Sequence, residues 1–337
     1  MYNRQFRGLA AIYGLTYTPG PWIKSIQLNK GTGSVANCFE SIAGQINVEL
    51  QKPEDSEKLY LNLYANQAGR IEANVNTAFK INSKWATGLL LHAKSNSIKQ
   101  DRNKDGFLDV PIGQSYIVIN RLKYSGDGGL RFQFGLKATY VDKQGGQLDF
   151  NPSSDAGGTA YWGMKNKTNR YEAWAKIGKD YVDKPWRTFG FQVSGLYHNQ
   201  SNYFGLTTYE GNQQGAYANL IYQSIIANVN HSIRGGVSFQ YDDYKEELNK
   251  TNYDHIESAG GVFAEYTYLL DEKFSAVVGL RGDYHNSYGF FVTPRLHVRY
   301  APRPSTVIRA SAGRGQRTAI ILPENMGLMA SSRQWLI

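Results

Sequence analysis

The sequence predicts an all-β protein, a transmembrane antiparallel up-and-down β-barrel, and three observations support this prediction. Apolar and polar residues alternate in runs of about ten, a period typical of strands with two different faces. Short and long connections between these runs alternate as well. The mean hydropathy of -0.47 is polar, although the 337 residues include 24 Tyr and 15 Phe. No apolar run approaches the roughly 18 to 20 residues of a membrane helix, so strands are the predicted membrane elements.

The first distinctive segment is KSIQLNKGTGSVANCFESIAGQINVELQKP, residues 24–53. It places a glycine-rich turn between two short apolar runs. A phosphate-binding loop would need a helix after the glycines, and a second apolar run follows here instead. The segment is therefore predicted to form a strand, a turn and a strand. Gly31, Gly33 and Gly44 would permit tight turns and positive φ angles in it.

From Lys58 onward the alternation of apolar and polar residues recurs about thirteen times. The clearest run lies between residues 130 and 141. One of its faces is Leu130, Phe132, Phe134, Leu136, Ala138 and Tyr140, and the other is Arg131, Gln133, Gly135, Lys137 and Thr139. Similar alternation occurs in residues 74–81, 274–284 and 293–300.

The connections between the runs fall into two classes. Tight turns are predicted at 82–85, 125–129, 182–186, 228–231, 270–273 and 301–305, and long polar loops at 95–114, 143–168, 202–214 and 244–257. Short turns on one rim and long loops on the other are typical of membrane barrels. Aromatic residues near the run ends are then expected at the membrane interfaces: Tyr124, Tyr140, Trp186, Tyr197, Tyr268 and Tyr300. A soluble barrel or propeller also alternates, but it explains the apolar, aromatic faces less completely.

Composition argues against several other classes of protein. The formal net charge is +9, but Lys and Arg are scattered singly, so we expect no nucleic-acid partner. Cys38 is alone and gives neither a disulfide framework nor a metal cluster. The six histidines lack the paired spacing of a metal site, and His92 and His297 are predicted to face the lumen. Because no catalytic motif is recognisable, we expect no enzyme.

Two motifs resemble sequences of TonB-dependent outer-membrane receptors. PGPWIKSIQLNKGTGSV and ESIAGQINVELQKP resemble the end of the plug domain of that family. ASAGRGQRTAIILPENMGLMASSRQW, Ala310 to Trp335, resembles a barrel strand and loop that carry a GRGFRTAN…ENxG pattern. The sequence of these motifs is most similar to that of receptors of the Bacteroidetes group. The motifs occur in the family's order and enclose the alternating runs, so the resemblance covers essentially the whole chain.

The resemblance implies two parts, the C-terminal part of a plug in residues 1–55 and the N-terminal part of the barrel in residues 56–337. Receptor barrels of this kind have about 22 strands around a plugged lumen, so about thirteen strands imply an incomplete barrel. No signal peptide or TonB box is visible, and we expect the chain to be part of a longer receptor. The implied architectural residues of the plug are Gly31, Gly33, Ser34, Glu40, Ser41, Gly44 and Asn47. Cys38 stands where a smaller residue is expected.

The function implied by the resemblance is active transport of a scarce ligand, a ferric siderophore or another metal chelate, across the bacterial outer membrane. TonB and its inner-membrane energising complex are the implied partners, with outer-membrane lipid and lipopolysaccharide around the barrel. Alternation alone would equally suit a passive porin or a structural barrel. The segment from residue 23 to 53 favours transport, since a passive pore has no reason to contain a plug.

Two groups of loop residues are candidates for ligand binding. Asp101, Asn103, Asp105 and Asp109 occupy the first, third, fifth and ninth positions of a calcium loop, but Ile112 stands where a bidentate Glu would complete it. These residues could bind a calcium ion, and a plain polar turn is the alternative. No other cofactor is expected. Five loop aromatics could stack on a ligand: Tyr161, Trp162, Tyr203, Tyr209 and Tyr253.

Overall fold

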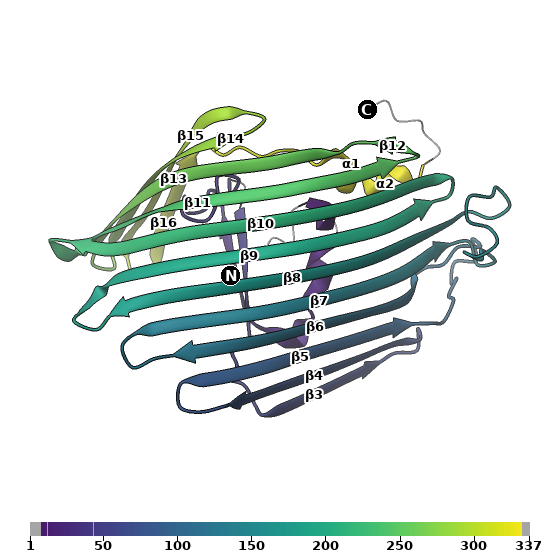
Figure 1. Ribbon diagram of the computed structural model, residues 1–337, viewed down its shortest axis with the longest axis horizontal. Coiled ribbons are helices and arrows are strands. Elements are labelled where there is room, and N and C mark those ends of the chain that lie inside the picture. The colour runs from purple at the N-terminus through teal and green to yellow at the C-terminus, as the bar shows by residue number, and fades with distance from the viewer. Residues whose placement is uncertain (1–7, 12, 43, 332–337) are drawn as a thin grey trace.

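The computed structural model describes residues 8–11, 13–42 and 44–331, and most of them lie in strands (Figure 1). The strands are β1 (Ile23–Lys30), β2 (Gly44–Leu50), β3 (Leu59–Ala65), β4 (Arg70–Lys80), β5 (Trp85–Asn96), β6 (Ile112–Ser125), β7 (Leu130–Gly146), β8 (Gly163–Tyr181), β9 (Lys184–Phe204), β10 (Thr207–Ile226), β11 (Asn228–Leu248), β12 (Thr251–Asn252), β13 (His255–Leu270), β14 (Phe274–His285), β15 (Gly289–Arg303) and β16 (Thr306–Gly313). The short helices are η2 (Gly8–Ala10), η3 (Gly14–Tyr17), η4 (Gly20–Trp22), α1 (Ile321–Glu324) and α2 (Met326–Met329). None of the helices in the described ranges is long and apolar enough to cross a membrane.

The strands form two separate antiparallel sheets. β1 and β2 pair with each other, and the other strands form one 14-stranded sheet. In this sheet thirteen strands follow one another in chain order from β3 to β16, while the short β12 pairs only with β11. The predicted antiparallel meander of about thirteen strands is therefore confirmed. Within the described residues β3 and β16 are the edges of a curved, open sheet (Figure 1).

The two faces of the large sheet have the polarity that the alternation predicted. Lys137 and Thr139 on the inner face are 6% and 3% exposed, whereas Leu136, the residue before Lys137, is 48% exposed on the outer face. Buried inner residues elsewhere are also polar, and include Asn74, Asn76, Arg170, Gln200, Asp242 and Thr293. A sheet with a polar inside and an apolar outside is suited to lipid around it and water within it.

Aromatic residues form two belts on the outer face. Toward the long loops, Tyr116 stacks on Tyr140 and Tyr171 stacks on Tyr197, with ring centroids 6.1 Å and 6.4 Å apart. Toward the short turns, Trp85 lies 4.9 Å from Tyr124. Trp186 and Tyr300, at the same rim, are exposed as well. Belts at two heights match the interfacial positions that amphipathic rings prefer.

The connections differ from the prediction at two of the four long loops. Six tight turns lie at or next to the predicted positions, and the loops at 97–111 and 147–162 lie within the longer predicted loops. In contrast, β9 and β10 continue to Gly205 and Leu206, a two-residue turn in which Gly205 has a φ of +61°. β11 likewise continues to Leu248 and carries β12. The polar composition of these segments suggested loops, but their backbone groups pair in the strand ladder instead.

The apolar outer face of the sheet leads to a prediction about stability. Val278 is 51% exposed on the outer face of β14, and replacing it by Arg in the full-length protein is expected to cost about 2–4 kcal/mol, because a cation at the bilayer midplane is poorly solvated. Urea unfolding in lipid vesicles measures this difference. Ser287→Arg, in the exposed turn after β14, is the control and should change stability by less than about 0.5 kcal/mol. Equal losses in both variants would contradict a lipid-facing outer surface.

Candidate functional site

The described residues between 8 and 55, which we call the inner segment, lie against the concave face of the large sheet (Figure 1). Trp22 is fully buried and packs with Leu90, Ile117, Ile119 and Trp174 of the barrel wall. Tyr17 packs near Val141, and its burial raises the pKa of the phenol to about 12. Trp22 also meets His92 edge to face at 6.3 Å, which confirms that His92 faces the lumen.

The turn between β1 and β2, described over residues 31–42, is kept compact by small residues. Gly31 has a φ of +86°, which favours glycine strongly. Gly33 and Gly44 have no positive φ, and they are needed for space instead. A Cβ on Gly33 would lie 2.3 Å from Ser41 Oγ, and one on Gly44 would lie 3.0 Å from the Asn29 carbonyl oxygen. Positive φ was thus predicted at three glycines and is found at one.

One barrel arginine donates four hydrogen bonds to this turn. Arg295 on β15 is only 3% exposed. Its guanidinium donates to four backbone carbonyls: those of Gly33 at 2.8 Å, Ser34 at 3.0 Å, Cys38 at 2.8 Å and Phe39 at 3.0 Å. A planar fork of five N–H donors can satisfy several acceptors at once. The turn is therefore fastened to the barrel wall through its main chain.

A second arginine and two other wall residues also bind the turn. Arg281 on β14 donates to the Val35 carbonyl at 3.2 Å and is itself held by Asp283 at 2.6–3.0 Å. Glu265 accepts a hydrogen bond from the Ser34 hydroxyl at 2.6 Å. Asn219 donates to the Ala36 carbonyl at 3.1 Å. We call Asn219, Glu265, Arg281 and Arg295 the latch residues. They come from four different strands, β10, β13, β14 and β15.

The other predicted plug residues make contacts inside the inner segment. The Ser41 hydroxyl donates to the Gly44 carbonyl at 3.4 Å, and Asn47 donates to Gln27 at 3.1 Å. The Glu40 backbone N–H lies 3.5 Å from the Cys38 sulfur. Cys38 is buried with Phe39, Ala259 and Phe291, so its side chain helps to pack the turn against the barrel.

The five candidate aromatics lie in different surroundings near the long-loop rim. Tyr161 and Trp162 lie in the 147–162 loop, and Trp162 approaches Phe107 at 6.2 Å. Tyr203 and Tyr209 were predicted in a loop but lie on β9 and β10, because those strands extend past the predicted boundary. Tyr209 is fully buried and donates to Glu246 at 2.6 Å, which leaves it no face for stacking. Tyr253 packs against the cluster that contains Tyr209.

The Asp101 loop is organised by its own backbone. Asp101 accepts a hydrogen bond from the Gly106 N–H at 2.9 Å, Asp105 accepts one from Phe107 at 2.8 Å, and Asp109 accepts one from Arg102 at 2.9 Å. Asn103 donates to Asp105 at 2.8 Å. In the part of the chain that the structure describes, no group of three or more His, Cys, Asp or Glu residues could hold a metal ion.

Comparison with known proteins gives the family of this chain. Residues 62–330 match the family described as TonB dependent receptor-like, beta-barrel. The chain belongs to this family. Members of it are proteins of the bacterial outer membrane, which agrees with the apolar outer face. The prediction of the family is confirmed, whereas the closer resemblance to receptors of the Bacteroidetes stays a prediction.

Solved structures share the fold at low sequence identity. The siderophore receptor PirA from Acinetobacter baumannii has a TM-score of 0.71 at 12% identity, over 90% of this chain and 49% of that one. The copper transporter OprC has a TM-score of 0.71 at 14% identity, over 92% and 53%. The alcaligin outer membrane receptor FauA from Bordetella pertussis has a TM-score of 0.67 at 10% identity, over 89% and 50%. The chain thus spans about half the length of these structures. No curated protein sequence matches it.

In a TonB-dependent receptor the latch residues occupy the boundary between the barrel wall and the segment inside it. Sequence alternation placed Arg281 and Arg295 on the polar face of their strands without separating them from other polar wall residues, and it did not single out Glu265. The sequence signal that could have found them is a pair of arginines on neighbouring strands that lie opposite a glycine-rich turn. Whether they lie opposite it depends on how segments about 260 residues apart, such as those with Gly33 and Arg295, are aligned in the fold.

The latch leads to a prediction about opening of the turn. Arg295→Gln removes hydrogen bonds from a charged donor, a loss of about 1.5–3 kcal/mol, and should raise the open fraction of the turn roughly tenfold to a hundredfold. The rate at which a maleimide labels the buried Cys38 thiol in the full-length receptor measures this fraction. Arg299→Gln is the matched control on the same strand, because Arg299 donates to Glu272 at the short-turn rim. Equal labelling rates in both variants and the native protein would show that Arg295 does not hold the turn closed.

The calcium expectation for the Asp101 loop stays a prediction. Calcium binding there would appear as uptake of one ion in a calorimetric titration of the full-length receptor, and Asp101→Asn with Asp105→Asn would abolish it, because the loop would lose two hard anionic ligands. Magnesium serves as the control cation. An absence of heat in the native receptor identifies the loop as a polar turn stabilised by its own backbone.

Proposed function

We propose that the full-length protein transports a metal chelate, most simply a ferric siderophore, across the outer membrane with energy delivered by TonB and its inner-membrane complex. The observation that carries this proposal is that the latch residues of the barrel wall hold the inner segment by exchangeable hydrogen bonds. The proposal assigns no enzymatic activity.

The chemistry of the latch suits a gate better than a permanent seal. Its acceptors are mainly backbone carbonyls, which water can solvate equally well once the turn moves. Each such bond contributes only about 0.5–3 kcal/mol net. A pulling force on the inner segment would therefore meet small successive barriers. An inner segment fixed by a continuous apolar core would instead have to expose all of that surface together.

The ligand class is inferred from the relatives. PirA is described as a siderophore receptor, FauA as the receptor for alcaligin, and OprC as a copper transporter. These descriptions share a metal ion, free or chelated, as the transported species. The fold similarity supports this class and leaves the particular chelate to experiment.

Energised uptake separates this proposal from a passive or structural barrel. The full-length gene would be expressed in a host without its own siderophore receptors, and radioactive iron would be supplied on a panel of siderophores. We expect saturable uptake of at least one chelate, lost when the host lacks TonB or is treated with a protonophore. An Arg299→Gln variant should transport normally. Uptake that rises linearly with the concentration of the chelate and is unaffected by the protonophore would identify a passive pore.

A further inference from the structure

Three basic side chains lie together on the inner face of the sheet, at the end that carries the long loops. Arg70 is the first residue of β4, Lys94 lies near the end of β5, and Lys143 lies near the end of β7. Arg70 pairs with the buried Asn96, which shares the face of Lys94, and Lys143 follows the buried Val141 by two positions. Since residues two apart on a strand share a face, all three point inward. We call Arg70, Lys94 and Lys143 the luminal cations.

The wall between Lys94 and Lys143 carries small side chains at this height. β6 lies between β5 and β7, and its inward residues here are Gly113 and Ser115. Ser115 pairs with Lys94, and Gly113 pairs with Lys143. β5 and β7 are two strand spacings apart, about 10 Å. The two lysines therefore face the lumen across one short stretch of wall.

The nearest carboxylate neutralises only part of this group. Glu72 is shared between Arg70, whose Nε atom lies 2.7 Å away, and Lys94 at 3.6 Å. The cross-strand partners of Lys143 are a glycine and an asparagine, and among the described residues it takes part in no ion pair. The charged side chains that act on Lys143 are Lys94 and Arg70, both cations. Three cations and one carboxylate leave a net charge of +2.

Other acidic residues at this rim are directed elsewhere. Asp142 points to the outer face, where it pairs with Lys165 at 3.5 Å. Asp149 and Asp155 belong to the loop at 147–162, beyond the strand ends. The carboxylates of the loop at 97–111 accept hydrogen bonds from their own backbone. The charges of that loop balance, with three cations and three anions: Lys99, Arg102, Lys104, Asp101, Asp105 and Asp109.

The inner segment lies next to the luminal cations without adding charge. Tyr17 packs with Val141, the inward residue that precedes Lys143 on β7. Residues 8–18 contain no charged side chain. A ligand that enters from the long-loop side would therefore meet cations on this part of the wall and an uncharged inner segment beside them.

Farther round the sheet the same rim is acidic and covered. Glu246 on β11 and Glu257 on β13 are 3% and 2% exposed, and each lies 3.9 Å from a ring nitrogen of His255. Tyr209, which donates to Glu246, is packed beneath the short helices α1 and α2. An anion in the lumen would therefore be attracted to the β4–β7 side, where the charge is positive and the wall is open.

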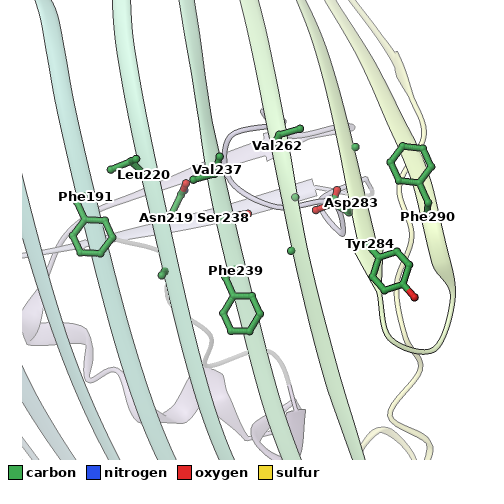
Figure 2. Close-up of a pocket in the computed structure, with 14 residues that line it drawn as sticks. Phe191, Asn219, Leu220, Val237, Ser238, Phe239, Val262, Asp283, Tyr284 and Phe290 are labelled. Carbon is green, nitrogen blue, oxygen red and sulfur yellow. The ribbon is translucent and has the colours of Figure 1, made fainter.

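The outer face has a groove, but its chemistry does not suit a charged ligand. The groove lies on β9 to β15 and has a volume of about 500 Å³. Figure 2 shows the rings of Phe191, Phe239 and Phe290 along it, with the inner segment behind the strands. The charged residue in its lining, Asp283, is bound to Arg281 at 3.0 Å. Recognition of charge is therefore a property of the inner face.

We propose that the luminal cations recognise the transported chelate as an anion, so that the receptor selects chelates in which catecholate or carboxylate oxygens outweigh the charge of the metal. This inference rests on the proposed function and names the class of ligand. Guanidinium and ammonium groups donate strong, charge-assisted hydrogen bonds to such oxygens. In a ferric tris-hydroxamate the singly charged ligands balance iron(III), and a neutral chelate of this kind would leave the cations without a counter-charge.

Equilibrium binding to the purified full-length receptor in detergent tests the preference for charge. The probes are a ferric tris-catecholate, ferric citrate and a neutral ferric tris-hydroxamate, each prepared with radioactive iron. We expect an anionic chelate to bind more tightly than the neutral one, and added salt to weaken its binding by screening. Lys94→Gln and Lys143→Gln should each weaken this binding about tenfold, the loss of one charge-assisted hydrogen bond. Lys143→Arg should retain it.

Lys165→Gln is the matched control, because it removes the same charge at the same rim but from the outer face. It should bind the anionic chelate as the native receptor does, and the shift in gel mobility on heating reports that every variant is folded. The inference fails if the neutral chelate binds as tightly as the anionic ones, or if no anionic chelate binds. It also fails if either luminal lysine variant binds like the native receptor, or if Lys165→Gln weakens binding equally.

The binding assay is independent of the test of transport, because binding in detergent needs no TonB. Energised uptake of a neutral chelate would contradict the anionic class and leave active transport intact. Tight, charge-dependent binding without energised uptake would support the luminal cations as a ligand site and contradict the proposed transport.

Discussion

In lipid, every backbone N–H and C=O group must find its partner within the protein, and the structure follows from this constraint. Thirteen of the described strands pair in chain order, so each strand between the two edges β3 and β16 is satisfied by its neighbour on either side. No long-range crossover is needed, and local turns such as Gly205–Leu206 determine the register. Side chains are then free to alternate, and the solvent on each face decides their polarity. Lipid outside and water inside produce an apolar exterior and a polar inner wall.

The polar inner wall in turn determines how a segment can be held inside it. An inner wall of Asn, Gln, Arg and Glu side chains offers hydrogen bonds and little continuous apolar area. The inner segment accordingly uses a few aromatic anchors, chiefly Trp22, and otherwise presents backbone carbonyls to the wall. Burying such polar groups without partners would cost about 1–3 kcal/mol each. The latch residues remove that cost, and they do so with contacts that water can replace.

The sequence revealed those features that depend on local periodicity. The alternation of Leu136 with Lys137 and Thr139 was enough to predict the sheet, its faces and its aromatic belts. The boundaries of the loops were harder to predict from the sequence. Polar segments beyond the membrane, such as the one around Tyr209, continue as strands in which both faces are polar. The partners of the inner turn could not be predicted at all. Arg295 meets Gly33 only because the strands between them curve back, and this curvature is a property of the whole sheet.

The choice of arginine at the latch has a physical reason in the shape of the turn. Residues 33–39 lie outside the β1–β2 ladder, so most of their carbonyls have no strand to pair with. A lysine ammonium could reach such acceptors only as a point charge, whereas the planar guanidinium of Arg295 donates to four carbonyls at once. The barrel wall thereby acts as the missing partner of the turn. Displacing the turn exposes both the carbonyls and the guanidinium, and only water can satisfy them again. Movement of the inner segment would consequently be coupled to hydration of the lumen, which is the change that the proposed passage for a polar chelate requires.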